Sequence, residues 1–431
     1  MIGSLPSMLG FGPDKRTVVA GDLDAITTIG PEADPEQAGV DHAAVESIWA
    51  SVRQWYRTGA NPAIQICLRR EGTVILNRSI GYSPHRATTA LRALDSSPVT
   101  PDTPACVYSA SKGITATVVH MLAERGAFGL DDRVCTYLPG FVGHGKDRIT
   151  IQHLLDYSAG IPALPGDVPL IELIADNDRM RVTLESLRPL HRPGLRHIYH
   201  PVTAGLVLGA IVHAATGRRI RDVLADEILG PLGFRWTNYG VAQDDLPLVA
   251  RCATTGRTPP ASLSGMMRRS MSASLEEIVD LANDRLFLTT ELPPANIVST
   301  AAEMARFYEI LLRGGELDGV RVMSPRTVRR AIAPRGRLLG VPGLRVGSGF
   351  VLGQRVGILG RHTETLFGHF GFTSVFAWAD PARGLSGAIV PTGKSMTAGN
   401  IQLPLLLDRI AGRIPRVSRP LDMAGVRSWA A

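Results

Sequence analysis

The sequence is poor in cysteine, lysine and aromatic residues. Its four cysteines are far apart and form no C-x-x-C pair, which excludes a zinc ribbon and gives no support to a disulfide scaffold. A reducing compartment fits this usage best. Aromatic residues make up 6% of the chain, which argues against an aromatic-rich carbohydrate binder. Only four of the 46 basic residues are lysines, at positions 15, 112, 146 and 394.

The chain also lacks a dense basic segment and a long apolar run. The net charge of +7 comes from scattered arginines, so we expect no nucleic-acid partner. The longest apolar stretch, Val202–Ala215, is too short to span a bilayer, and residues 1–30 show no signal-peptide pattern. We therefore expect a cytoplasmic protein without an integral membrane segment. Peripheral association with the cell envelope stays open, as does the oligomeric state.

Several catalytic motifs are absent. The chain has no G-x-S-x-G, no H-E-x-x-H, no P-loop, and no G-x-G-x-x-G that opens a helix after a strand. His197 and His200 have no carboxylate or cysteine near them at ligand spacing. We expect neither a metal nor a cofactor.

At 431 residues, the chain is long enough for two or three units of roughly 100–200 residues each. Hydrophobic periodicity and turn residues predict helices and strands at both ends of the chain and mostly helices between them. The predicted helices span about 41–59, 109–125, 202–215, 300–312 and 401–410, and the predicted strands span 63–69, 73–80, 347–352, 374–379 and 385–390.

From this pattern we expect a sheet domain interrupted by a helical insertion. Residues 1–39 form an N-terminal arm, 40–145 and 295–412 the discontinuous sheet domain, 146–294 the helical domain, and 413–431 a C-terminal tail. Residues 240–294 look irregular. They are either a lid over a site or a plain surface insertion.

One motif carries chemistry: Tyr108-Ser109-Ala110-Ser111-Lys112. Ser109 and Lys112 are three residues apart at a predicted helix start, so they share one face. A serine needs a base to become nucleophilic, and a buried lysine with a lowered pKa can be that base. The alternative is an N-capping serine beside an exposed lysine, because S-x-x-K alone is a weak signal.

Further segments give that motif its context, and they occur in a fixed order. These are Gly129-Leu130-Asp131-Asp132-Arg133-Val134, the run from Ile149 to Pro162 (ITIQHLLDYSAGIP), Tyr199–Gly209, Ser299–Ala305 and Gly368–Thr373. Together they resemble the serine β-lactamase-like family of class C β-lactamases, D-Ala-D-Ala peptidases and family VIII carboxylesterases. The arm and Ala38–Trp49 resemble actinobacterial lipase/esterase members.

The resemblance implies an α/β (α+β) fold, in which helices and an inserted, mostly helical domain flank a central antiparallel sheet. It also implies that Ser109 is the acylated nucleophile, Lys112 its base, and Tyr199 the proton shuttle to the leaving group. The oxyanion hole would be the N–H groups of Ser109 and Phe372. The residues that would line the substrate site are His369, Gly371, Tyr108 and His200.

Some of these assignments have structural alternatives. Tyr199 is otherwise a core tyrosine, and His369 a hydrogen-bonded structural histidine. Two positions depart from the penicillin-recognising pattern: Pro201 replaces the asparagine of Y-x-N, and His369 replaces the lysine of K-T-G. Both substitutions remove groups that orient an acylamino carboxylate, which favours a neutral ester.

We therefore expect a carboxylesterase, with a small-molecule ester of short to medium acyl chain as substrate. A β-lactamase or D-amino-acid peptidase is the second hypothesis. A non-catalytic binding module on the same fold is the third.

Overall fold

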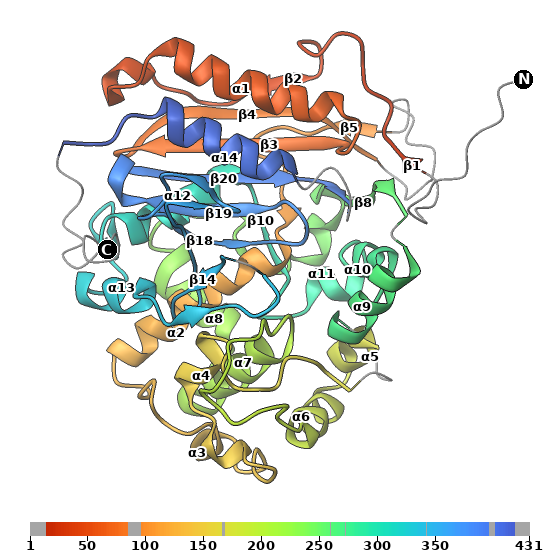
Figure 1. Ribbon diagram of the computed structural model, residues 1–431, viewed down its shortest axis with the longest axis vertical. Coiled ribbons are helices and arrows are strands. Elements are labelled where there is room, and N and C mark those ends of the chain that lie inside the picture. The colour runs from red at the N-terminus through yellow and green to blue at the C-terminus, as the bar shows by residue number, and fades with distance from the viewer. Residues whose placement is uncertain are drawn as a thin grey trace, which may run out of the picture.

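A computed structural model describes residues 14–84, 96–165, 169–258, 260–271, 273–341, 343–395 and 401–418. Its centre is a ten-stranded sheet in which every pair is antiparallel. In spatial order the strands are β13 (Gly336–Arg337), β14 (Arg345–Val346), β15 (Val351–Leu352), β18 (Phe367–Phe370), β19 (Phe376–Asp380), β20 (Leu385–Pro391), β3 (Ala63–Arg70), β4 (Thr73–Pro84) and β2 (Thr27–Ile29), with β5 (Ser96–Pro98) also paired to β4. This confirms the expected antiparallel sheet (Figure 1).

The sheet joins the two ends of the chain. β20 pairs with β3 over seven residues, from Leu385 opposite Arg70 to Pro391 opposite Ile64. β3 and β4 form the predicted hairpin, but its loop is two residues rather than three. Glu71 (φ 49°) and Gly72 (φ 93°) are both left-handed, which is the geometry that matches the twist of a two-residue hairpin.

Two hydrophobic cores lie on opposite faces of the sheet, because successive side chains of a strand alternate. Ile64, Ile66 and Leu68 belong to one core, whereas Ala63 and Cys67 belong to the other. On the first face lie α1 (His42–Arg57) and α14 (Gln402–Arg413); α2 (Ser111–Glu124) and α12 (Ala301–Leu312) lie on the second (Figure 1). The sheet is therefore buried on both sides.

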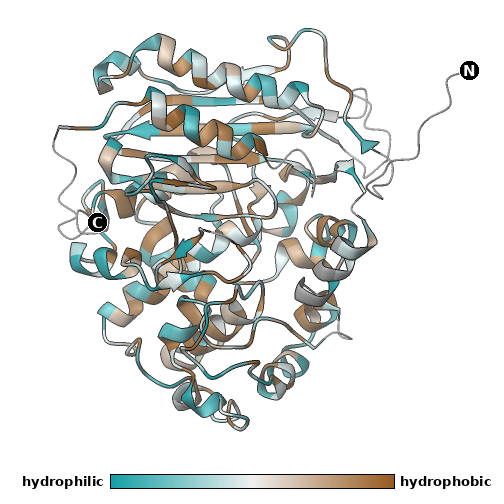
Figure 2. Ribbon diagram, viewed as in Figure 1, coloured by the Kyte–Doolittle hydropathy of each residue, from teal (hydrophilic) through white to brown (hydrophobic). Residues whose placement is uncertain are grey.

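The middle of the chain is helical. Its central helix is α7 (Thr203–Thr216), which is coloured as hydrophobic in Figure 2, whereas the outer α6 (Asn177–Ser186) is largely hydrophilic. The other helices and short strands here are α3 (Val134–Tyr137), α4 (Ile151–Leu155), α5 (Leu170–Ala175), α8 (Ile220–Leu224), β6 (Ala105–Cys106), β7 (Asn238–Tyr239), β8 (Ala253–Thr254), β9 (Gly256–Arg257) and β10 (Ile297–Ser299).

Residues 240–294 are more regular than their sequence indicates. They contain α9 (Ala261–Met271), α10 (Leu275–Leu281) and α11 (Arg285–Thr289). Ser274 and Glu277 form a capping box at the start of α10, and Asp284 caps α11. These caps stabilise helices that are too short to show a clear hydrophobic period.

Two parts of the expected arm, residues 14–15 and 27–29, are paired with other strands. β1 (Asp14–Lys15) pairs with β9, and β2 extends the main sheet beyond β4. The remaining elements of the sheet domain are α13 (Pro325–Ile332) and the short strands β11 (Glu316–Leu317), β12 (Val320–Arg321), β16 (Val356–Gly357), β17 (Gly360–Arg361) and β21 (Gly393–Lys394).

The Glu309 carboxylate ties α12 to the sheet. It is 1% exposed and accepts hydrogen bonds from Arg69 on β3 (2.5 Å) and from Arg313 (2.7 Å). Glu309→Ala leaves these cations facing a buried void, so we expect a loss of about 3 kcal/mol in the free energy of unfolding. The exposed pair Glu172–Arg179 is the control, and Glu172→Ala should cost less than about 1 kcal/mol. Equal urea midpoints for the two variants would refute this role of Glu309.

Candidate active site

Ser109 lies in a tight turn between β6 and α2. The turn is a short 3₁₀ segment, Tyr108–Ala110, and Tyr108 adopts a left-handed backbone conformation (φ 50°) that is strained for a large residue. The buried Tyr108 ring is packed between the Lys394 ammonium, 4.9 Å from its centroid, and the Phe372 ring at 5.6 Å. These contacts hold the turn, and the Ser109 side chain remains partly exposed.

Lys112 lies one turn further on and is aimed at the serine. Its Nζ is 2.9 Å from Ser109 Oγ and donates to the Pro294 carbonyl at 2.8 Å. The side chain is buried, and burial lowers the pKa of its amine from 10.5 to about 7. Near neutral pH a large share of Lys112 is therefore uncharged, and the same 2.9 Å contact can then carry a proton from Oγ to Nζ.

The carbonyl that holds Lys112 is fixed by close packing. Pro294 lies against Gly205 of α7, where an added Cβ would come within 2.8 Å of its backbone nitrogen. The buried Asn296 side chain ties down the same loop by donating to the carbonyls of Phe287 (2.7 Å) and Thr290 (2.6 Å). The sequence analysis did not identify Pro294 or Asn296, because the loop has no catalytic motif of its own.

Tyr199 completes the group around the serine. Its ring centroid lies 5.2 Å from Lys112 Nζ. Burial raises the pKa of the Tyr199 hydroxyl above its ordinary value, and a hydrogen bond with Ser109 partly offsets that rise. The phenol is therefore protonated at neutral pH and able to donate. The structure thus brings together the three residues predicted to be catalytic.

His369 lies behind this group rather than on its exposed side. It is 1% exposed, its Nδ1 is 2.8 Å from the Phe370 carbonyl, and its Nε2 is 2.8 Å from the Tyr157 hydroxyl. Nδ1 must carry the proton to satisfy the carbonyl, so Nε2 accepts from Tyr157. Burial first, and then the Lys112 charge, lower the pKa of His369 to about 3. The ring is neutral, and the Tyr199 ring lies tilted beside it, with 6.3 Å between the ring centroids.

Gly371 and Phe372 lie directly against the serine turn. An added Cβ at Gly371 would come within 2.2 Å of the Val107 carbonyl, so only glycine allows this approach. The Gly371 N–H donates to Val375 (2.8 Å), and Phe372 follows at the end of β18 with its ring against Tyr108. The backbone of Phe372 is thereby positioned beside the turn that carries Ser109.

His200 does not fit its predicted substrate-binding role. It is completely buried; its Nε2 accepts from the Ile161 N–H (3.0 Å) and its Nδ1 is 2.6 Å from the Ile198 carbonyl. With both ring nitrogens used, it fastens the chain on either side of Tyr199. Tyr108 and Gly371 are likewise buried and support the turn, so neither presents a side chain to a substrate.

Two polar residues beside the site were not predicted from the sequence. Tyr157 ends the run ITIQHLLDY, and its hydroxyl is 2.8 Å from His369 Nε2. Lys394 is one of only four lysines; it is fully buried under Tyr108 and donates to the Pro391 carbonyl at 2.6 Å. The scarcity of lysine was the one signal that pointed to it.

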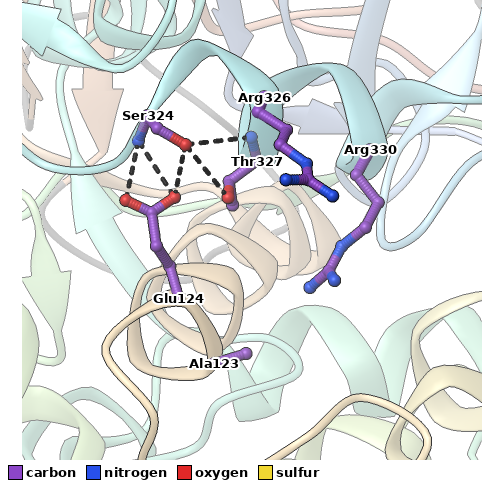
Figure 3. A pocket seen from close by; sticks show the side chains of 6 residues that line it. All are labelled: Ala123, Glu124, Ser324, Arg326, Thr327 and Arg330. Carbon is purple, nitrogen blue, oxygen red and sulfur yellow. Dashed lines mark hydrogen bonds between the residues drawn. The ribbon is translucent and has the colours of Figure 1, made fainter.

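No group of three or more His, Cys, Asp or Glu side chains in the described ranges is placed to hold a metal ion. No helix within the same ranges is long and apolar enough to cross a membrane. One surface pocket, of about 620 Å³, lies where Glu124 accepts hydrogen bonds from Ser324 near Arg326 and Arg330 (Figure 3). Glu124 is twelve residues beyond Lys112 on α2, about 18 Å along the helix, so this pocket is separate from the serine site.

A serine with an adjacent buried lysine and tyrosine, on an antiparallel sheet covered by helices, defines a class of acylating serine hydrolase. Residues 44–409 match the family described as Beta-lactamase. The chain belongs to this family and is one of its serine hydrolases.

Named relatives fall in the same family. The chain is 30% identical to "Esterase/beta-lactamase LipL" of Mycobacterium tuberculosis over 399 residues, 89% of this chain and 87% of that protein. A penicillin-binding protein homologue from Caulobacter crescentus superposes with a TM-score of 0.74 at 26% identity, over 90% of this chain and 99% of the other. A family VIII carboxylesterase shares the fold, with a TM-score of 0.74 at 24% identity, over 89% and 99% of the two chains.

The lowered pKa of Lys112 predicts how the reactivity of Ser109 depends on pH. Only neutral Lys112 accepts a proton, so the rate of phosphonylation by a fluorophosphonate should rise with pH up to about 7 and then level off. Well below that pH, the rate should fall about tenfold per unit. Intact-mass measurements of labelling between pH 5 and 9 test this. A constant rate below pH 7 would contradict the role of Lys112.

Proposed function

We propose that this protein is a carboxylesterase that cleaves esters of short to medium acyl chain through a covalent acyl-enzyme. The observation that carries the proposal is the 2.9 Å contact between Ser109 Oγ and the buried Lys112 amine. The alignment with a relative named esterase/β-lactamase over most of both chains adds support.

In the acylation step, neutral Lys112 takes the proton of Ser109 as Oγ attacks the ester carbonyl. The N–H groups of Ser109 and Phe372 donate hydrogen bonds to the carbonyl oxygen, on which negative charge develops. The protonated Tyr199 phenol then delivers a proton to the leaving alkoxide, and Lys112 restores the proton to Tyr199. In deacylation, a water molecule attacks the acyl-enzyme, the same groups accept its proton, and Ser109 is regenerated with release of the acid.

Two features favour a neutral ester over an anionic β-lactam. Pro201 offers no side-chain hydrogen bond to an acylamino group, and His369 is neutral and buried against Tyr157. A missing charge-assisted hydrogen bond costs about 1.5–3 kcal/mol, or about 10–100-fold in rate. β-Lactam or D-amino-acid peptide hydrolysis is the alternative that the relatives' names keep open. The lowered pKa of Lys112 argues against a purely binding role.

The test compares p-nitrophenyl butyrate with nitrocefin. We expect kcat/KM for the ester to exceed that for nitrocefin by about 10-fold or more, because the site lacks a charge-assisted hydrogen bond to the nitrocefin carboxylate. Ser109→Ala should abolish ester hydrolysis, and Tyr199→Phe should lower kcat about 10²–10⁴-fold. The control is Tyr137→Phe. It removes a hydroxyl on helix α3 that donates to Asp132 (2.6 Å), and it should leave the rate unchanged.

Each outcome bears on one part of the proposal. Nitrocefin turnover equal to that of the ester would reject the esterase assignment. Retained activity in Ser109→Ala, or labelling of another serine, would reject the nucleophile. Near-normal turnover by Tyr199→Phe would move the proton donor elsewhere.

His369 provides a separate test of substrate choice. A lysine at this position would add a cation that attracts a carboxylate across a partly desolvated site. His369→Lys should therefore raise the ratio of nitrocefin to ester turnover, even if both absolute rates fall because the Tyr157 contact is lost. Tyr157→Phe removes that contact without adding charge and is the matched control. An unchanged ratio in His369→Lys would refute the electrostatic explanation.

A further inference from the structure

Two segments of the chain that lie next to the site carry positive charge with no acidic residue to balance it. No Asp or Glu occurs between Glu185 and Asp222, and none occurs between Asp318 and Glu364, although the second interval contains nine arginines. Other acid-free runs, such as residues 246–275 with four arginines, are shorter and hold fewer arginines. In the sequence these arginines look scattered, because residues 222–318 separate the two intervals.

The fold places these intervals side by side. The Leu339 N–H donates to the His197 carbonyl (2.9 Å), and His197 forms a parallel bridge with Leu338. The Ile198 N–H donates in turn to the Tyr157 carbonyl (2.9 Å), so both segments adjoin Tyr199. The strands β13 and β14 form the end of the sheet nearest α4 and α7, where β14 is visible in Figure 1. We call residues 187–197 and 335–341 the basic rim.

The basic rim exposes leucines among its arginines. Leu190, Leu195 and Leu339 are 74%, 63% and 54% exposed. Single exposed leucines are ordinary, but here three occur on two adjoining segments and are open to solvent. The same two segments contain Arg192, Arg196 and Arg337.

These arginines are not neutralised within the chain. In the described part of the structure, the side chains of Arg192, Arg196 and Arg337 are exposed and take part in no ion pair. Arg337 also stands directly opposite Arg345 in the β13–β14 pair, and like charges in that position destabilise a sheet. Anionic groups bound over the pair would relieve this repulsion.

We infer that the basic rim is a docking surface for an anionic phospholipid bilayer. Arginine guanidinium groups pair with lipid phosphates, and leucines between them enter the boundary between headgroups and acyl chains. A nucleic acid would match the charge but would gain little from three exposed leucines. Docking here would bring the partly exposed Tyr199 and Ser109 to the membrane surface; that consequence for catalysis, unlike the docking itself, rests on the proposed esterase function.

Co-sedimentation with vesicles tests the docking without any catalytic readout. The full-length protein should sediment with phosphatidylglycerol vesicles, bind phosphatidylcholine vesicles far less, and dissociate as salt is raised. Each arginine near an anionic surface contributes about fivefold to partition, so Arg192→Gln/Arg196→Gln/Arg337→Gln should weaken binding about 100-fold. Leu190→Ser/Leu195→Ser/Leu339→Ser should weaken it as well.

The matched control is Leu405→Ser/Arg409→Gln on α14. Leu405 is 55% exposed and Arg409 is exposed one turn further on, but α14 lies beside α1, away from β14 (Figure 1). This variant should bind vesicles as the wild type does. All variants should keep their melting temperature and their hydrolysis of soluble p-nitrophenyl butyrate, which separates a failure of docking from a failure of the proposed function.

Three results would overturn the inference. The first is no preference of the wild-type protein for phosphatidylglycerol over phosphatidylcholine. The second is equal loss of vesicle binding in the rim variants and the α14 control. The third is loss of self-association or of duplex DNA binding in the rim variants with vesicle binding unchanged, which would assign the surface to a second copy or to a nucleic acid.

Discussion

The chemistry proposed for this protein depends on the burial of a single amine, that of Lys112. Lys112 is 6% exposed and has the Ser109 hydroxyl and one carbonyl as its polar contacts, and this environment lowers the pKa of its amine to about 7. A carboxylate beside the amine would stabilise the ammonium and raise that pKa again. The neighbours of Lys112 are instead uncharged: a phenol, a neutral imidazole and a peptide carbonyl. Among the described residues no carboxylate pairs with the Lys112 amine, and burial therefore keeps its pKa low.

Much of the surrounding structure serves to keep those neighbours uncharged and in place. The neutral state of His369 follows first from its own burial and then from the Lys112 charge, both of which lower its pKa. Tyr157 satisfies the free imidazole nitrogen, and the Phe370 carbonyl satisfies the other. A lysine at position 369 would place a second cation near Lys112, and like charges disfavour each other's protonated forms. The neutral imidazole instead leaves burial as the cause of the low Lys112 pKa.

Only the local part of this arrangement could be predicted from the sequence. The spacing of Ser109 and Lys112 on a helix start, the β3–β4 hairpin and the antiparallel sheet were all predictable, because each depends on neighbours in the chain or on a family pattern. The contact between Tyr157 and His369 was not, because it joins residues 212 positions apart. His200 was misjudged for a related reason: its sequence neighbours give no hint that two backbone groups use both ring nitrogens. The strand predicted at 347–352 is only two residues long, since Gly349 (φ 90°) breaks it.

The same reasoning explains how exposed positive charge and the low pKa of the buried Lys112 amine occur in one molecule. A cation added close to Lys112 would act through a low dielectric and change its pKa, whereas an exposed arginine is screened by water and salt. Positive charge can therefore accumulate on residues 187–197 and 335–341 without disturbing the amine, although Tyr199 lies only two residues beyond the first segment. A neutral interior and a basic, leucine-bearing exterior coexist in this fold. Leu338 and Val346 belong to the same buried cluster as Tyr157, in the core that α1 and α14 cover. This cluster places packed apolar side chains, rather than charges, next to the neutral groups around Lys112.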